Sequence, residues 1–127
     1  MVRLVCFLKR KPGMSTEEFH SYWRDHHGPL VMSTRSGSYV RRYVQFHRSH
    51  SGVPDQQEPE YDGVTEQWFD SIESYFKSIS EPDYRVVAAD LSNFLDVGKL
   101  VFTLVEDDGE PVDAPAREVR GQRGSSS

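Results

Sequence analysis

One segment, residues 15–30 (STEEFHSYWRDHHGPL), constrains the fold of this chain more than any other. It begins with a capping-box pattern, in which the Ser15 hydroxyl accepts an amide proton near Glu18 while the Glu18 side chain reaches back to the backbone of Ser15. Aromatic and apolar residues then recur at steps of three and four, the spacing that places side chains on one face of a helix. The residues of this face are Phe19, Tyr22, Trp23, His26 and Leu30. The segment predicts an amphipathic helix.

Gly28-Pro29 interrupts the helical pattern. Pro29 has no amide donor and disfavours a helical conformation at the residue before it, so we expect the first helix to end near His27. Pro29 is also suited to the first position of a second short helix, which would end between about Ser33 and Ser36. The interruption would leave two adjacent histidines at a helix end, beside an aromatic face.

The rest of the chain divides into strand and helix patterns. Runs of apolar and β-branched residues of strand length occur at 2–9, 39–47, 63–69 and 99–105. A second helical region is expected over 72–79, with further helical packing positions from 86 to 95, and 49–62 is expected to be a polar loop. The order βαββαβ predicts a ferredoxin-like α+β fold, a four-stranded antiparallel sheet with the helices on one face. Because the uncovered face also carries apolar side chains, we expect it to pair with a second copy in a homodimer.

Composition limits the possible partners. The 127 residues suffice for one domain, which we expect over 1–106, followed by an acidic, Gly- and Ser-ending disordered tail over 107–127. A formal net charge of −5 is opposite to the basic surface that nucleic acid requires. We find no signal or membrane-spanning pattern, so we expect a cytoplasmic protein with no membrane association. Cys6 is the only cysteine and is expected to be a buried small side chain rather than a nucleophile.

The N-terminal third resembles a known family. The matching stretches are LKRKPGMS (8–15), Glu18-Phe19, Tyr22-Trp23 and HGPLV (27–31), and they resemble the EthD domain family of the dimeric α+β barrel superfamily. This resemblance, over roughly residues 2–105, implies a homodimer in which two sheets face each other to form a barrel, with a cleft between sheet and helices in each subunit. The family is named after an accessory protein of ether-degrading bacteria. Fungal relatives resemble polyketide decarboxylases, and neighbouring families include polyketide cyclases and cofactor-free monooxygenases.

The histidines of the first helix are the leading candidate site. His27 matches the histidine of the family's H-x-P motif, and a histidine near a helix C-terminus is favoured as a cation and can transfer protons near neutral pH. The alternative is that His27 only binds carbonyl groups freed by the helix break. His26 lies on the aromatic face and is expected in the core or at the edge of the cleft, whereas His20 is expected on the surface.

Two strands supply further candidates. In the strand 39–47, one face is polar yet aromatic, and it could either line the cleft and hold an oxygen-rich aromatic ligand or form a wet dimer interface. This face consists of Tyr39, Arg41, Tyr43, Gln45 and His47. In the strand 63–69, Glu66 shares a face with Trp68 and could be an acid or base of raised pKa, or could simply pair with an arginine such as Arg41. No histidine spacing predicts a metal site, and no glycine-rich loop predicts a nucleotide site.

Two classes of function remain open from the sequence. The first is a cofactor-independent enzyme that decarboxylates, cyclises and dehydrates, or oxygenates a small aromatic or carbonyl metabolite. His27 would then be the general acid/base, with Tyr43, His47 or Glu66 polarising a substrate oxygen. The second is a non-catalytic dimer that binds a metabolite for a partner oxidoreductase in a degradation or secondary-metabolite pathway. In either class the expected ligand contacts are Tyr22, Trp23, His26, Arg41, His47 and Trp68.

Overall fold

The computed structural model describes residues 1–49, 59–106, 111–113 and 115. Its strands and helices are, in chain order, β1 (Val2–Leu8), α1 (Thr16–Tyr22), α2 (Gly28–Ser33), β2 (Arg42–His47), β3 (Gly63–Phe69), α3 (Ile72–Ser80), α4 (Tyr84–Asp90) and β4 (Val101–Glu106). A π-helical turn, Trp23–His27, joins α1 to α2, and short 3-10 turns cover Ser36–Tyr39, Leu91–Asn93 and Val97–Lys99. This is the predicted βαββαβ order.

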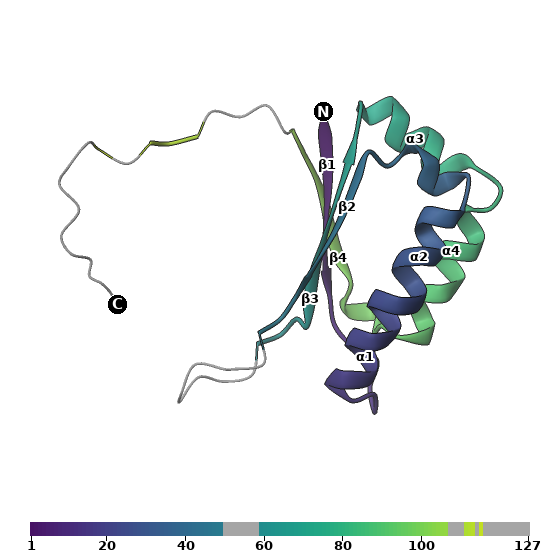
Figure 1. Ribbon diagram of the computed structural model, residues 1–127, viewed down its shortest axis with the longest axis vertical. Helices are drawn as coiled ribbons and strands as arrows, with labels where there is room; N and C mark the ends of the chain where they lie inside the picture. Colours follow the sequence, from purple (N-terminus) through teal and green to yellow (C-terminus); the bar gives the residue numbers. More distant parts are fainter. Residues whose placement is uncertain (50–58, 107–110, 114, 116–127) are drawn as a thin grey trace.

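The four strands form one antiparallel sheet in the order β2-β3-β1-β4. Figure 1 shows all the helices on one side of this sheet and none on the other. The ferredoxin-like arrangement predicted from the sequence is therefore confirmed. Among the described residues, no helix is both long and apolar enough to span a bilayer.

The strand register decides which side chains face the helices. Residues directly opposite each other in an antiparallel pair share a face. Cys6 lies between Thr65 of β3 and Phe102 of β4, and these three side chains belong to the helix-covered face. One residue earlier along β1, Val5 lies opposite Glu66, and both belong to the outer face. Each functional side chain on a strand can be assigned to one of these two faces.

Helix α1 starts at the predicted capping box. Ser15 accepts from the Glu18 amide at 3.1 Å, and the Ser15 amide donates to the Glu18 carboxylate at 2.9 Å. Two buried clusters attach the helices to the sheet: Leu8, Phe19, Trp23, Phe94 and Leu95 form one, and Val2, Val40, Phe69 and Tyr75 form the other.

The expected second short helix is confirmed as α2, which ends at Ser33 and has Pro29 in its first turn, but the expected loss of helical conformation at Gly28 is wrong. Gly28 keeps helical dihedral angles (φ −56°, ψ −53°), and its amide donates to the carbonyl of Trp23, five residues back. This wider π-helical bonding lets the chain remain helical up to a proline that cannot donate. The Trp23 carbonyl also accepts from Nε2 of Gln45 at 2.8 Å, which ties the turn to β2.

The π-helical turn also corrects the expected position of His26. Because a π turn bonds residue i to i+5 rather than i+4, it advances the buried face of the helix by one residue. Trp23 is fully buried and the next inward side chain is His27, which is 6% exposed. The side chain of His26 is 58% exposed.

Two predicted segments fall largely outside the described residues. The expected polar loop, 49–62, is described only at 49 and 59–62. Of the expected tail, 107–127, only residues 111–113 and 115 are described, and they are exposed.

The contact between Trp23 and Gly63 yields a stability prediction. A Cβ atom at Gly63 would lie 2.4 Å from Cζ3 of the buried Trp23 ring, so Gly63→Ala forces the indole or the strand to move. We expect a loss of about 1–3 kcal/mol in the free energy of unfolding, measured by urea denaturation. Gly98→Ala is the control, since its Cβ would meet only Asp96 Oδ1 at an ordinary 3.5 Å. Equal stabilities of the two variants would contradict this packing.

Candidate functional site

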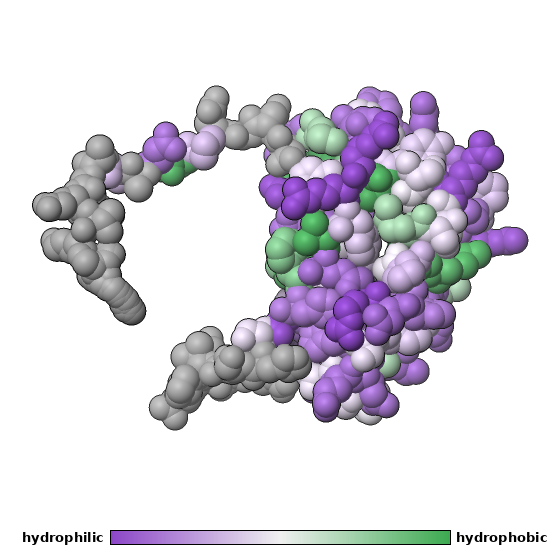
Figure 2. Space-filling model, viewed as in Figure 1, coloured by the Kyte–Doolittle hydropathy of each residue, from purple (hydrophilic) through white to green (hydrophobic). Residues whose placement is uncertain are grey.

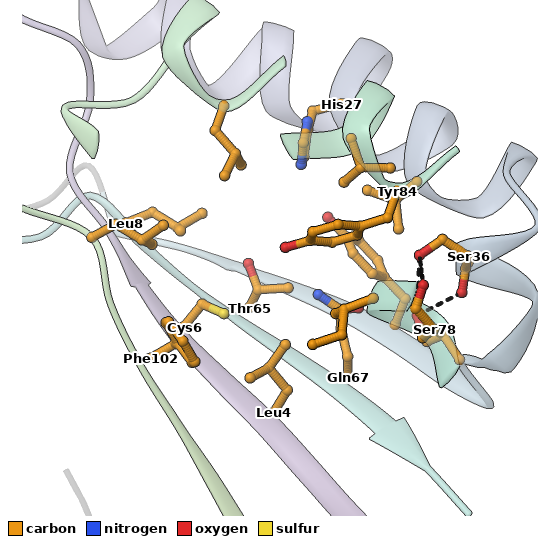
Figure 3. Close-up of a pocket in the computed structure, with 18 of the residues that line it drawn as sticks. Leu4, Cys6, Leu8, His27, Ser36, Thr65, Gln67, Ser78, Tyr84 and Phe102 are labelled. Carbon is orange, nitrogen blue, oxygen red and sulfur yellow. Dashed lines mark hydrogen bonds between the residues drawn. The ribbon is translucent and has the colours of Figure 1, made fainter. Parts of the chain in front are cut away.

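A cavity of about 150 Å³ lies between the sheet and the helices. Members of both buried clusters line it, so it separates the two halves of the core. Figure 3 shows the ring of His27 above the cavity, Tyr84 reaching in from the helix side, and Cys6, Thr65 and Gln67 on the sheet side. The cavity is the place where helix-borne and strand-borne polar groups meet.

A buried carboxylate holds the His27 ring. Nδ1 of His27 lies 2.7 Å from Oδ2 of Asp90, the last residue of α4, and both residues are 6% exposed. The Tyr22 hydroxyl donates to Oδ1 of Asp90 at 2.5 Å, and Nδ2 of Asn93 donates to the same oxygen at 3.0 Å. The Asp90 carboxylate thereby links α4 to α1, to the π-helical turn and to the 3-10 turn Leu91–Asn93.

These contacts determine the tautomer of His27. Burial acts to raise the pKa of Asp90, but the hydrogen bonds from Tyr22, Asn93 and His27 outweigh it and lower the pKa below its ordinary value of 3.8. Asp90 is therefore ionised at neutral pH and can only accept hydrogen bonds. Nδ1 of His27 must carry the proton, and Nε2 keeps its lone pair.

Burial keeps His27 neutral. It lowers the pKa of His27 below 6.5, and the hydrogen bond and negative charge of Asp90 offset this only in part. The nearby His26 lowers the pKa further. The sequence-based expectation of a cation favoured by a helix C-terminus is thus wrong, because the helix continues past His27 and the ring is buried. At neutral pH the cavity faces an imidazole that can accept a proton.

Tyr43 and Trp23, two of the site residues predicted from the sequence, also line the cavity. The Tyr43 hydroxyl accepts from Nε2 of Gln45 at 3.2 Å. Burial raises the pKa of Tyr43, and the neighbouring Gln45 and Trp23 side chains offset this only in part. Nε1 of Trp23 is buried and makes no hydrogen bond within the described part of the chain.

His47 lies on the helix-covered face of β2, with Tyr43 and Gln45. Its Nε2 is 2.9 Å from Oε1 of Gln45, and its Nδ1 is 2.6 Å from Nδ1 of His20. His20 is therefore not a surface residue: it is 6% exposed, because the ring of His47 from β2 packs against it. His47 contacts Trp23, with ring centroids 4.3 Å apart, but does not line the cavity itself.

Two members of the predicted polar strand face lie elsewhere. Tyr39 precedes β2 and donates to Oε2 of Glu81 at 2.7 Å. Arg41 is exposed and binds the Asp70 carboxylate, with its shortest contact at 2.6 Å. Arg41 does not reach the cavity.

Glu66 and Trp68 lie on the outer face, away from the cavity. Glu66 pairs with Arg3 at 2.9 Å, so its carboxylate does meet an arginine, although not Arg41. The guanidinium groups of Arg3 and Arg42 lie 5.2 and 5.0 Å from the centre of the Trp68 ring.

Tyr22 and His26 lie behind the cavity. Tyr22 holds Asp90 and does not line the cavity. The His26 ring lies 4.6 Å from that of Tyr22, and its Nε2 is 3.7 Å from Oδ1 of Asp90. Both residues contact Oδ1 of Asp90, whereas His27 contacts Oδ2, and neither lines the cavity.

Several residues of the site were not identified from the sequence: Thr65, Gln67, Tyr84 and Asp90. The sequence carries one signal for Asp90, which occupies the apolar stripe of α4 at helical spacing from Val87 and Phe94. An acid on such a stripe needs a buried partner. Across the described ranges, no three His, Cys, Asp or Glu side chains are arranged to hold a metal ion.

Comparisons with known proteins agree with this fold. The EthD domain model matches residues 11–98. The structure is similar to that of an EthD (ethyl tert-butyl ether d) family protein from Bacillus halodurans C-125, with 19% identity, a TM-score of 0.66, and 84% of this chain and 98% of that chain covered. No match was found among curated proteins.

Two other solved structures share the fold. A dimeric protein of unknown function and ferredoxin-like fold from Bacteroides fragilis NCTC 9343 has 11% identity and a TM-score of 0.58, over 83% of this chain and 94% of that chain. SnoaB, a cofactor-independent oxygenase from Streptomyces nogalater, has 10% identity and a TM-score of 0.57, over 86% and 94%. At such identities the likeness is one of fold.

The lowered pKa of His27 predicts a pH-dependent stability. Below pH 6.5 the unfolded chain takes up a proton at this residue that the folded chain does not, so stability falls as the pH falls, by about 1.4 kcal/mol per unit until the folded pKa is reached. Asp90, whose folded pKa is also lowered, adds a loss in the same direction below about pH 3.8. Urea denaturation of wild type and His27→Gln from pH 5 to 8 measures the difference. His26→Gln should keep the wild-type dependence, and an unchanged dependence in His27→Gln would contradict the prediction.

Proposed function

This chain belongs to the EthD domain family, and on that premise we propose that it is a cofactor-independent enzyme that removes a proton from a small aromatic or carbonyl compound in the cavity. The observation that carries the proposal is the 2.7 Å contact of His27 Nδ1 with the ionised Asp90, which leaves Nε2 able to accept a proton at the cavity wall.

The proposed chemistry begins with transfer of a proton from an acidic C–H or phenolic O–H to Nε2 of His27. The imidazolium that forms is stabilised by Asp90, which Tyr22 and Asn93 hold in place. The negative charge left on the substrate oxygen needs donors, and the cavity offers the hydroxyls of Tyr43 and Tyr84. Burial raises the pKa of both, so both keep their protons.

Removal of a proton is a step that cyclisation with dehydration, decarboxylation and cofactor-free oxygenation can share. The description of SnoaB as a cofactor-independent oxygenase supports the view that this fold can act without a cofactor. It does not select among the three reactions.

Proton exchange tests the proposal without knowledge of the natural substrate. We expect the wild-type protein to accelerate the exchange of acidic C–H protons of small 1,3-dicarbonyl and polyphenolic compounds in D₂O, followed by NMR. His27→Ala should lower this rate by about a hundredfold or more, and Asp90→Asn should lower it strongly through the wrong tautomer.

His26→Ala is the matched control, since His26 neighbours both residues but its side chain is 58% exposed. It should leave the exchange rate within about twofold, and all three variants should be compared at equal folded fraction by circular dichroism. Exchange that is equally fast in wild type and His27→Ala would rule out His27 as the base.

A second candidate function is a non-catalytic binder that assists a partner oxidoreductase. This function is favoured by polar side chains of the cavity wall that are available to bind a ligand. The side chains of Thr65, Gln67 and Tyr84 make no hydrogen bond within the described residues. Binding of a compound with equal affinity in wild type and His27→Ala, without exchange in either, would support this function instead.

We propose in addition that the protein is a homodimer formed through the outer face of the sheet. Figure 2 shows hydrophobic side chains gathered over the side of the sheet that lacks helices, on the left of the view. Phe46 and Val101 on this face are 48% and 49% exposed. The apolar residues of this face are Val5, Phe7, Val44, Phe46, Val64, Trp68, Val101 and Val105. The dimeric Bacteroides fragilis protein of the same fold supports the proposal.

A pair of glutamate variants tests the dimer. Phe46→Glu would place a carboxylate within the proposed interface and should weaken the dimer at least tenfold, measured by light scattering across a concentration series. Phe76→Glu is the control, because Phe76 is 55% exposed on α3 and lies away from the sheet. A wild-type protein that is monomeric at micromolar concentration, or dimers weakened equally by both changes, would contradict the proposed interface.

A further inference from the structure

Among the residues that the structure describes, none that lines the cavity has a charged side chain. Its lining contains no lysine, arginine, aspartate or glutamate, and Asp90 is separated from it by the His27 ring. The polar lining residues are all neutral groups: Ser36, Tyr43, Thr65, Gln67, Tyr75, Ser78 and Tyr84, with Cys6 and His27. The rest of the lining is aliphatic or aromatic.

We infer that the cavity takes an uncharged single-ring phenol or ketone with two oxygen substituents and rejects the corresponding carboxylate. The inference names the substrate class of the proposed proton-transfer site and therefore rests on that function. The inference depends on the composition and size of the cavity, so it can be tested in a variant that lacks the His27 imidazole.

The size of the cavity limits the ligand to about one ring. An apolar cavity of about 150 Å³ holds a molecule of the size of benzene. Burying a carboxylate there without a cation would cost several kcal/mol, whereas a phenol or ketone needs only hydrogen bonds. The described residues of the wall include no lysine or arginine, so the wall discriminates against anions.

The titratable groups that line the cavity respond to the same environment. Burial raises the pKa of the Cys6 thiol to about 12 and also raises the pKa values of Tyr75 and Tyr84. It lowers the pKa of His27, whose charged form is the cation. In every case the neutral form is favoured, and a bound ligand would experience the same preference.

The available hydrogen-bonding groups indicate where the two oxygens would bind. Figure 3 shows the Tyr84 and Thr65 hydroxyls and the Gln67 amide pointing into the cavity. Ser36 and Ser78, by contrast, satisfy each other through two 2.7 Å bonds to backbone carbonyls. One oxygen of the ligand would meet the hydroxyls below His27, and the other would meet the amide of Gln67.

This neutral wall also bears on the reaction. A bound neutral substrate gives its proton to Nε2 of His27, and the only charges formed are the imidazolium and the substrate anion beside it. The negative Asp90 behind the ring balances the imidazolium. Decarboxylation would require a carboxylate to bind first, so the wall favours the reactions that begin from a neutral molecule.

Matched probes test the inference by calorimetry. We expect 3-methoxyphenol to bind folded wild-type protein at least tenfold more tightly than 3-methoxybenzoate at pH 7.5, and we expect the same preference in His27→Ala, which lacks the base. Equal or tighter binding of the benzoate, or no measurable binding of the phenol to folded protein, would overturn the inference.

A pH series with His27→Ala provides a second test, because no histidine then titrates in the cavity wall. The apparent affinity for 3-methoxybenzoate should rise in proportion to its protonated fraction as the pH is lowered, since only the neutral acid binds. An affinity that does not change with pH would show that the anion binds and would overturn the inference. Failure of the proton-exchange assay with the phenol preference intact would count against the proposed function alone.

Discussion

Pro29 cannot donate an amide hydrogen, and the chain remains helical before it by bonding the Gly28 amide to the carbonyl of Trp23, five residues back. This wider turn directs Trp23 and then His27 inward. Trp23 fills the space above Gly63 on β3, and His27 meets Asp90 at the end of α4. This shift of the buried helix face by one residue brings His27, the proposed base, to Asp90 and places Trp23 and His27 in the cavity wall.

The strand and helix order could be predicted from the sequence because periodicity and capping are local; the Ser15–Glu18 capping box and the βαββαβ order are observed as expected. The orientation of His26 could not be predicted, because residue periodicity assumes an α-helix and does not reveal a π turn. Asp90 is 63 residues from His27, and nothing in one sequence identifies such a pair. The faces of the strand 63–69 were equally ambiguous, since both carry polar groups: Thr65 and Gln67 line the cavity, and Glu66 lies opposite.

The proposed site combines an ionised carboxylate, that of Asp90, with a cavity whose described lining residues are neutral. Asp90 is ionised, but the His27 ring separates it from the cavity and it is satisfied by donors from Tyr22, Asn93 and His27. This arrangement lets a positive charge form on the imidazole while the cavity itself stays apolar enough to bind an uncharged molecule. The outer face of the sheet, which carries Arg3, Glu66 and Trp68, is the face to which a second copy of the chain would bind in this account.

The central claim is that His27 is a neutral imidazole with its proton on Nδ1 and a lone pair on Nε2. Nitrogen-15 NMR of the two ring nitrogens at pH 7.5 measures this directly. The account predicts a protonated Nδ1 and an unprotonated Nε2, with this preference lost in Asp90→Asn. A proton on Nε2 alone, or on both nitrogens, would contradict the claim and with it the proposed base.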